Sequence, residues 1–132
     1  MKILGTGIDI VESARIAESI RRHGERFLAR VFTDGERQYC SSMKKPEVFF
    51  AARFAAKEAV SKAFGTGISA QLCWLDIEVR RKASGEPFIV LHGEGVATAH
   101  RLGIDEVRLS LSHSEHYAVA HALALGAGEP RE

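Results

Sequence analysis

Residues 49–64 read FFAARFAAKEAVSKAF, a pattern that predicts a helix with apolar side chains on nearly every side. Such a helix must be buried, so the remainder of the fold has to be arranged around it. The same stretch carries four charged residues, Arg53, Lys57, Glu58 and Lys62. A buried charge is unfavourable unless it is paired, bound to a metal or engaged with a ligand, and the chemistry of the protein is therefore expected on this helix.

Two of these charges share one stripe of the helix. Glu58 and Lys62 stand four residues apart, and the small residues Ala51 and Ala55 flank them, which would let a ligand approach the backbone closely. A metal-bound phosphate would satisfy both the carboxylate and the ammonium. An ordinary ion pair between Glu58 and Lys62 explains the spacing equally well.

A second unusual carboxylate lies near the N-terminus. Residues 3–11 form an apolar run that predicts a strand, interrupted by Gly5, Gly7 and Asp9. Asp9 and Glu58 together would suit Mg²⁺, which prefers oxygen ligands and needs few of them from the protein. The alternative is that Asp9 ends the strand and caps the next segment. The glycines match no phosphate-binding motif and are expected to permit close packing of the strand.

The remaining pattern predicts an α+β domain over residues 1–125, in which a largely antiparallel sheet packs with the long buried helix, followed by a loose tail over 126–132. The expected order is β-α-α-α-β-β-α-β-β. Ser13 is expected to cap the first helix, and Thr33 with Glu36 forms a capping-box pattern before another. Helices are predicted over about 14–23, 34–42, 46–64 and 94–102, with a short helical continuation around 27–31, and strands over about 75–80, 87–91, 107–113 and 117–123.

Charge and cysteine content exclude several classes of protein. The 132 residues include 18 Lys and Arg against 17 Asp and Glu, a net charge of +1 that does not support nucleic-acid binding. No segment is apolar over a length that spans a bilayer, and the N-terminal residues do not form a signal peptide. Cys40 and Cys73 lie far apart without metal-site spacing, so reduced, packed thiols of a cytoplasmic protein are expected.

Two further groups of polar residues are candidates for binding. Ser112 and His113 offer a hydroxyl and an imidazole that could hold a phosphate, although a histidine at the end of a hairpin is usually a polar surface residue. Arginines gather on or just after the first helix, where a solvated helix face is the simplest interpretation. They are Arg15, Arg21, Arg22 and Arg26.

Three segments together resemble one known family. GTGIDIVE at 5–12, FAARFAAKEAVSKAFGTG at 50–67 and SLSHSEHYAVA at 110–120 are similar in order and spacing to the holo-acyl-carrier-protein synthases, the small class of 4'-phosphopantetheinyl transferases. The resemblance covers the chain from Ile3 to about Leu125. It implies the fold of that family, a role in fatty acid and lipid biosynthesis, and transfer of the phosphopantetheine arm of coenzyme A to a serine of apo-acyl carrier protein, with release of 3',5'-ADP. It also implies a requirement for Mg²⁺ and a homotrimer with active sites between protomers.

The resemblance also implies roles for particular residues. Asp9 and Glu58 correspond to the metal ligands, and Lys62 to a contact with the pyrophosphate. Nucleotide contacts are implied for Ser112 and His113 at the phosphates and for the hairpin of Gly85 and Pro87 near the adenosine. The chain departs from the family pattern at Glu86, where a lysine is common, and at Glu115 and His116. The base that removes the serine proton stays open between Glu58, Lys62 and a metal-bound water.

Partner surfaces follow from charge and from the resemblance. Acyl carrier proteins are acidic, so Arg15, supported by Arg21 and Arg22, is expected to dock the carrier. The hairpin over 107–123 is expected to form the subunit contact, because alanines leave one face of its return strand flat while larger side chains line the other. The alanines are Ala118, Ala120 and Ala122, and the larger residues are Tyr117, Val119 and His121.

Two other functions remain compatible with the residues. One is a non-catalytic module that binds coenzyme A or a nucleotide. The other is a structural oligomerisation domain in which the four charges of the long helix form internal ion pairs.

Overall fold

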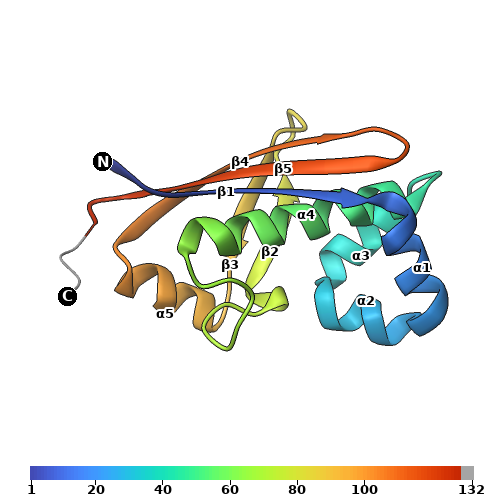
Figure 1. Ribbon diagram of the computed structural model, residues 1–132, viewed down its shortest axis with the longest axis horizontal. Helices are drawn as coiled ribbons and strands as arrows, with labels where there is room; N and C mark the ends of the chain where they lie inside the picture. The colour runs from blue at the N-terminus through green and yellow to red at the C-terminus, as the bar shows by residue number, and fades with distance from the viewer. Residues whose placement is uncertain (129–132) are drawn as a thin grey trace.

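The long helix α4 (Pro46–Phe64) runs through the centre of the computed structural model, which describes residues 1–128 (Figure 1). The other helices are α1 (Ser13–His23), α2 (Glu25–Val31), α3 (Asp34–Ser41), the short 3₁₀ helix η1 (Trp74–Asp76) and α5 (Glu94–Arg101). The strands are β1 (Lys2–Glu12), β2 (Ile77–Arg81), β3 (Pro87–Leu91), β4 (Ile104–His113) and β5 (Tyr117–Gly126). This order confirms the α+β prediction, with one refinement, since the short continuation after the first helix is a separate helix, α2.

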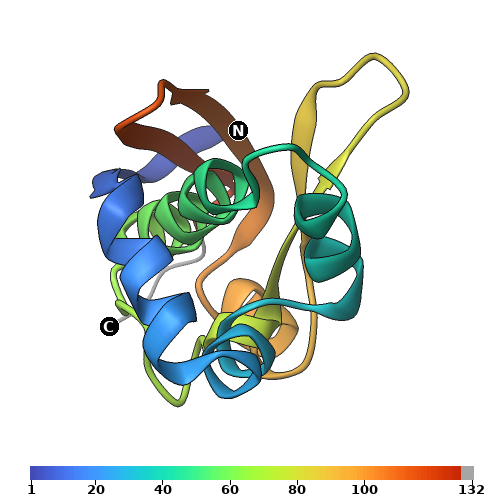
Figure 2. The same cartoon turned by 90° about the vertical axis from the view of Figure 1, so that its right-hand side faces the viewer.

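Two antiparallel sheets replace the one that was expected. The larger has the strand order β1-β5-β4 and lies along α4, while β2 and β3 form a hairpin that projects from the body of the protein (Figures 1 and 2). Helices α1, α2 and α3 gather at one end of α4 and α5 lies at the other (Figure 1). The N-terminal strand thus lies beside the last strand in the sequence, where Asp9 is paired with Ala120.

The core explains why α4 is apolar all round. Alanines of β5 alternate inward and pack against the helix, and Ala51 and Ala55 are themselves fully buried in this core. The expectation that Ala51 and Ala55 would admit a ligand is therefore wrong, because neighbouring protein fills that space. The inward-facing residues of β5 are Ala118, Ala120, Ala122 and Ala124.

Glycines of β1 permit a close approach to α4, as expected. A Cβ atom at Gly7 would lie 1.9 Å from the carbonyl oxygen of Ala59, and one at Gly5 would lie 2.0 Å from that of Ala63. Both distances are far below van der Waals contact, so no other residue fits at either position without moving the strand away from the helix. The missing side chains therefore set how near Asp9 comes to α4.

The ends of the helices follow the predictions with one exception. Thr33 and Glu36 form the predicted capping box at α3, and Gly65 ends α4 in the left-handed conformation, at φ 79°. The prediction for Ser13 is wrong. Glu12 occupies the N-cap position of α1, and the Ser13 hydroxyl is buried without a hydrogen-bond partner among residues 1–128.

Both cysteines are free thiols, but only Cys40 is packed. Burial raises the pKa of the Cys40 thiol to about 12, whereas Cys73 is exposed, which corrects the expectation for that residue.

Among the described residues, no helix combines the length and the apolar character that crossing a membrane requires. Residues 129–132 of the expected tail lie outside the described residues, and Gly126, placed in the tail by the sequence, ends β5.

Candidate active site

Asp9, Glu58 and Lys62 meet where β1 crosses α4. Strand alternation turns Asp9 toward the helix while its neighbours Ile8 and Ile10 face outward, and both isoleucines are more than half exposed. The Lys62 ammonium donates to the carbonyl oxygen of Ile8 at 2.9 Å and to Oδ1 of Asp9 at 3.2 Å. The three residues singled out on the sequence therefore lie together.

These residues line one hollow of about 340 Å³, called here the Asp9 hollow. Arg15 of α1 borders it, and Phe27 of α2 and Phe54 of α4 form apolar parts of its lining. The hollow thus combines three carboxylates, those of Asp9, Glu12 and Glu58, with two cationic groups and aromatic rings. Such a mixture suits a ligand that carries phosphates at one end and an apolar or peptide group at the other.

Glu58 is an unusual carboxylate in this hollow. Burial raises its pKa above the ordinary value, the nearby charge of Asp9 raises it further, and Lys62 offsets part of the effect. Asp9 and Glu58 repel each other across the hollow. A cation bound between them would relieve that repulsion.

The donor set fits Mg²⁺ in particular. Asp9 and Glu58 supply hard oxygen ligands, and Mg²⁺ is commonly held by one or two carboxylates together with water and substrate phosphates. Within residues 1–128 there is no cluster of three or more His, Cys, Asp or Glu side chains that could hold a metal. The arrangement accordingly favours a metal that is completed by a ligand over a metal held by the protein alone.

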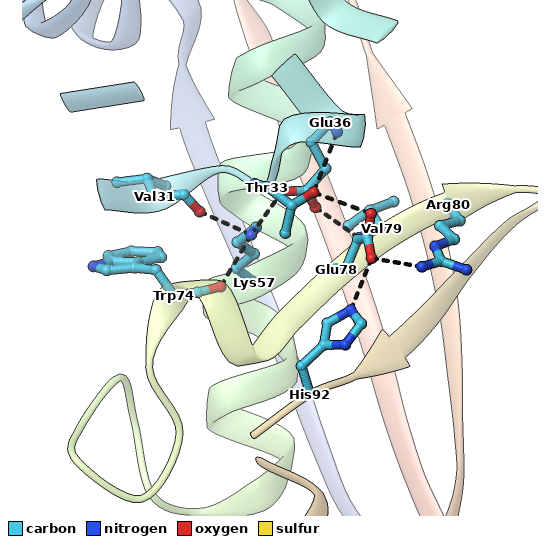
Figure 3. A network of polar contacts seen from close by, with 9 residues as sticks. All are labelled: Val31, Thr33, Glu36, Lys57, Trp74, Glu78, Val79, Arg80 and His92. Carbon is cyan, nitrogen blue, oxygen red and sulfur yellow. Dashed lines mark hydrogen bonds and ion pairs between the residues drawn. The ribbon is translucent and has the colours of Figure 1, made fainter. Parts of the chain in front are cut away.

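The simple ion pair between Glu58 and Lys62 does not form in the described part of the chain, because the Lys62 ammonium pairs with Asp9 instead. Lys57 does form an internal pair. Its side chain is fully buried, and its Nζ lies 2.8 Å from Oε1 of Glu36 (Figure 3). Burial lowers the pKa of Lys57, while the Glu36 carboxylate acts in the opposite direction.

The buried pair belongs to a larger polar network at the base of the β2–β3 hairpin (Figure 3). Oε2 of Glu36 accepts a hydrogen bond from the backbone N–H of Val79, and Thr33 donates from its hydroxyl to Glu78. Glu78 also contacts His92 and Arg80. Burial opposes the ionised form of Glu78, but the hydrogen bonds from His92, Arg80 and Thr33 outweigh it and lower its pKa.

Ser112 and His113 lie away from the Asp9 hollow. The two residues point to opposite faces of the sheet, since Ser112 pairs with Val119, whose side chain faces outward, and His113 pairs with the inward Ala118. The His113 ring lies against Phe49, with 5.0 Å between the ring centroids. The structure therefore does not bring Ser112 and His113 together on one face, and it places neither beside Asp9.

The hairpin residues form another separate region. Gly85 adopts φ 94° in the turn and donates its backbone N–H to the carbonyl of Lys82 at 2.8 Å. Pro87 borders a hollow of about 560 Å³ between the hairpin and β4. Neither Gly85 nor Pro87 lines the Asp9 hollow.

The arginines of the first helix differ in their surroundings. Arg15 borders the Asp9 hollow, whereas Arg21 is exposed and pairs with Glu18 of the same helix at 2.6 Å. Arg26 and Arg30 border a neighbouring hollow of about 400 Å³ that also includes Phe27. Arg22 is exposed on α1 and lines neither hollow.

Sequence reasoning missed the aromatic residues of the site. Phe54 stands one turn before Glu58 on α4, a spacing that would have indicated it, but Phe27 and Trp74 come from elements whose approach no local pattern predicts. The surroundings of Arg53 were missed too. This buried guanidinium lies over the ring of Tyr39 at 4.3 Å, and its Nε has no hydrogen-bond partner in the part of the chain that the structure describes.

Comparison with known proteins gives a consistent result. The model of the 4'-phosphopantetheinyl transferase superfamily matches residues 5–122. The holo-[acyl-carrier-protein] synthase of Koribacter versatilis is 52% identical over 121 residues, which cover 92% of this chain and 97% of the relative. A synthase of the same description from Chlamydia trachomatis is 50% identical over 122 residues, with 92% and 99% coverage.

Solved structures share the fold. The holo-[acyl-carrier-protein] synthase of Neisseria meningitidis superposes with a TM-score of 0.88 at 34% identity, covering 94% of this chain and 99% of that one. The Helicobacter pylori enzyme in complex with coenzyme A gives a TM-score of 0.82 at 32% identity, with 91% and 99% coverage. The Bacillus anthracis enzyme, in complex with coenzyme A (3',5'-ADP), gives 0.77 at 39% identity, with 92% and 96% coverage.

Proposed function

The chain belongs to the 4'-phosphopantetheinyl transferase superfamily and, within it, to the holo-[acyl-carrier-protein] synthases, and we propose that Asp9, Glu58 and Lys62 form its catalytic centre. It transfers the 4'-phosphopantetheine moiety of coenzyme A to a serine of apo-acyl carrier protein and releases 3',5'-ADP. The convergence of these three side chains on one hollow carries the proposal for the site.

The reaction replaces the phosphoanhydride bond of coenzyme A with a phosphodiester bond to the carrier serine. The serine oxygen of the carrier attacks the phosphorus attached to the pantetheine arm, the bond to the second phosphate breaks, and 3',5'-ADP leaves with the electron pair. Lys62 contributes by placing a positive charge beside the phosphates as negative charge shifts to the leaving group. The serine proton leaves to a base, for which the Glu58 carboxylate and Lys62 are the groups that the chain itself offers.

Asp9 and Glu58 would hold Mg²⁺, which when bound supplies positive charge to the phosphates of coenzyme A. The raised pKa of Glu58 supports this assignment, because the repulsion between Asp9 and Glu58 would be relieved by a cation. The contact between Lys62 and Asp9 holds the strand and the helix at the spacing that the site needs.

The carrier protein docks on the α1 side of the hollow in this proposal. Arg15 borders the Asp9 hollow, and Arg26 and Arg30 extend positive charge past Phe27, so an acidic carrier would find complementary charge beside the catalytic centre. Arg21 and Arg22 lie further along the same helix. Pairing of Arg21 with Glu18 reduces the charge it presents, so Arg15 stays the first candidate.

Assembly as a homotrimer is the second part of the proposal. Ile8, Ile10 and Tyr117 are exposed on the outer face of the larger sheet, and a run of exposed apolar side chains of this kind supports contact with other subunits. The contact would use the face of β5 that carries Tyr117, Val119 and His121, since the alanine face is buried against α4.

A nucleotide site between subunits follows from this assembly. Ser112, His113 and the hairpin of Gly85 and Pro87 lie apart from the catalytic centre in one chain, so we propose that they contact the nucleotide end of coenzyme A across a subunit boundary. The hollow that includes Pro87 is lined by Lys82 and Arg108, which pair with Glu86 and Glu106, so a phosphorylated ligand would have to draw these cations away from their carboxylates. We also propose a cytoplasmic location, which the two free cysteines support.

One experiment tests the function. The protein is incubated with coenzyme A, Mg²⁺ and an apo-acyl carrier protein, and the carrier is weighed by mass spectrometry. The expected result is a gain equal to one phosphopantetheine group, lost when a chelator replaces Mg²⁺. Tight binding of coenzyme A without any change in carrier mass would support a binding module instead, and no binding would support a structural role.

A further inference from the structure

Lys57 connects three elements around the helix that carries the catalytic centre. Its Nζ donates to the backbone carbonyl of Val31 at 2.8 Å and to that of Trp74 at 3.0 Å, in addition to its pair with Glu36 (Figure 3). Val31 is the last residue of α2 and Trp74 is the first residue of η1. One buried ammonium therefore holds the end of α2 and the start of η1 against α4.

The two elements held in this way carry aromatic residues that support the Asp9 hollow. Phe27 lies one turn before Val31 on α2 and lines the hollow. The ring of Trp74 stacks on that of Phe54, with 4.8 Å between centroids and 29° between planes, and Phe54 also lines the hollow. We call Phe27, Phe54 and Trp74 the aromatic wall.

The aromatic wall adjoins the catalytic carboxylate. Phe54 stands one turn before Glu58 on α4, so the two side chains share a stripe of the helix and both border the Asp9 hollow. Lys57 itself is fully buried and reaches no substrate. Any effect of Lys57 on the reaction therefore acts through the residues that it holds in place, and among these the residues of the wall lie at the Asp9 hollow.

From these contacts we infer that Lys57 is a positioning residue that fixes the aromatic wall and thereby orients the carrier serine at Glu58. The inference rests on the proposed function of the Asp9 hollow. An apolar side chain of similar length could fill the same space, and buried ion pairs are often replaceable in this way without loss of stability. Such a side chain cannot donate hydrogen bonds to the carbonyls of two separate elements, and small displacements of groups around a reacting centre lower rates strongly.

The test compares two variants. In Lys57→Met/Glu36→Gln, no charge is left unpaired, and the carbonyls of Val31 and Trp74 lose their shared donor. In the control Glu36→Gln, the pair is removed but Lys57 keeps both carbonyl contacts. Trp74 is the single tryptophan of the chain, so quenching of its fluorescence by acrylamide reports on the wall directly and needs no turnover.

The expected result is a difference between the variants. The double variant should show stronger quenching of Trp74 and a kcat for transfer lower by about tenfold or more, with the KM for coenzyme A unchanged because Lys62 still contacts the phosphates. The control should match the parent protein in quenching and in kcat. All assays are run at a temperature where circular dichroism shows each variant to be folded.

Three outcomes would overturn the inference. They are parental quenching and kcat in the folded double variant, equal impairment of both variants, and stronger quenching without a change in kcat. If the double variant does not fold, Trp74→Leu tests the wall alone, with Leu75→Ala on the exposed neighbouring side chain as its control. An unaltered kcat in Trp74→Leu would then refute the role of the wall. If the parent protein shows no transfer at all, the proposed function fails, while quenching still establishes whether Lys57 holds the wall.

Discussion

Lys62 and Asp9 stand 53 positions apart in the sequence, yet the ammonium of one lies 3.2 Å from Oδ1 of the other. The same ammonium donates to the Ile8 carbonyl at 2.9 Å, so a single side chain links β1 to α4 at the proposed catalytic centre. The side chain of Lys62 is half exposed, which leaves its remaining donor available to a phosphate.

Replacement of Lys62 by Met should therefore lower transfer more than stability. We expect the KM for coenzyme A to rise and kcat to fall, together reducing kcat/KM by about hundredfold, because one charge-assisted contact to the phosphates is lost. The melting temperature should change little, since an exposed ion pair contributes about 1 kcal/mol or less. Lys2→Met is the control at another exposed lysine, and equal kinetics for the two variants would remove Lys62 from the site.

Asp9→Asn and Glu58→Gln should each lower Mg²⁺-dependent transfer by about hundredfold or more, because each removes the negative charge of one of the two proposed metal ligands. Titration of Mg²⁺ against activity, and calorimetry of Mg²⁺ binding in the presence of coenzyme A, measure the effect. Glu47→Gln, on the same helix outside the hollow, should behave as the parent protein. Normal activity of either site variant at limiting Mg²⁺ would mean that its carboxylate is not a ligand.

The Glu58→Gln variant should also melt at a higher temperature than the parent at neutral pH. The folded state raises the pKa of Glu58 through burial and through Asp9, so between its ordinary pKa and the raised value the folded protein binds more protons than the unfolded chain. Stability from this group is present at acid pH and is lost as the pH rises through the folded pKa. The amide of Glu58→Gln does not ionise, so this variant keeps the stability that the parent protein loses. The rise in melting temperature should therefore be absent below the ordinary pKa of 4.5, where Glu58 is neutral in the folded and in the unfolded state. Equal gains at both pH values would contradict this account.

Arg15→Glu should raise the KM for the carrier protein by about tenfold while leaving the affinity for coenzyme A unchanged, because the reversed charge borders the hollow and repels an acidic partner. Arg21→Glu is the comparison on the same helix, and its effect should be smaller because Glu18 already pairs with Arg21. Steady-state kinetics at low salt measure both. A larger effect at Arg21 than at Arg15 would place the carrier elsewhere on α1.

Mixed trimers should recover activity. Asp9→Ala impairs the catalytic centre, and His113→Ala impairs the nucleotide contact. If the two halves of a site come from different chains, each half is intact in about half of the chains after reassembly in equal amounts. About a quarter of the interfaces then carry both intact halves. Transfer after dissociation and reassembly is compared with each variant alone. Persistent inactivity in trimers verified as mixed would assign both residues to one protomer.

The residues of the proposed catalytic centre were predictable because they break the local pattern. Asp9 interrupts an apolar strand and Glu58 and Lys62 lie on a buried helix, so their charges required an explanation from the sequence alone. The partner of Lys62 was not predictable, because the carboxylates of Glu58 and Asp9 are equally suitable partners for its ammonium. Lys62 pairs with Asp9 because β1 approaches α4 closely, which the sequence does not reveal.

The roles of the supporting residues were not predictable, because these residues fit the local sequence pattern. Glu36 reads as the last member of a capping box and fulfils that role, while its second function, as the partner of Lys57, depends on how α3 packs on α4. Ser112 and His113 are adjacent in sequence, but their pairing with Val119 and Ala118 turns them to opposite faces. Proximity along a strand is thus a poor guide to a shared site.

The position of β1 has a consequence for how the protein matures. The strand that carries Asp9 is synthesised first, yet its neighbour in the sheet is β5, the last strand of the fold. During translation β1 therefore has no neighbour in the sheet until β5 has been made. A chain that ends before Tyr117 offers β1 no strand to join and α4 no alanine face to pack on, so Asp9 can be held beside Lys62 only after β5 has been made.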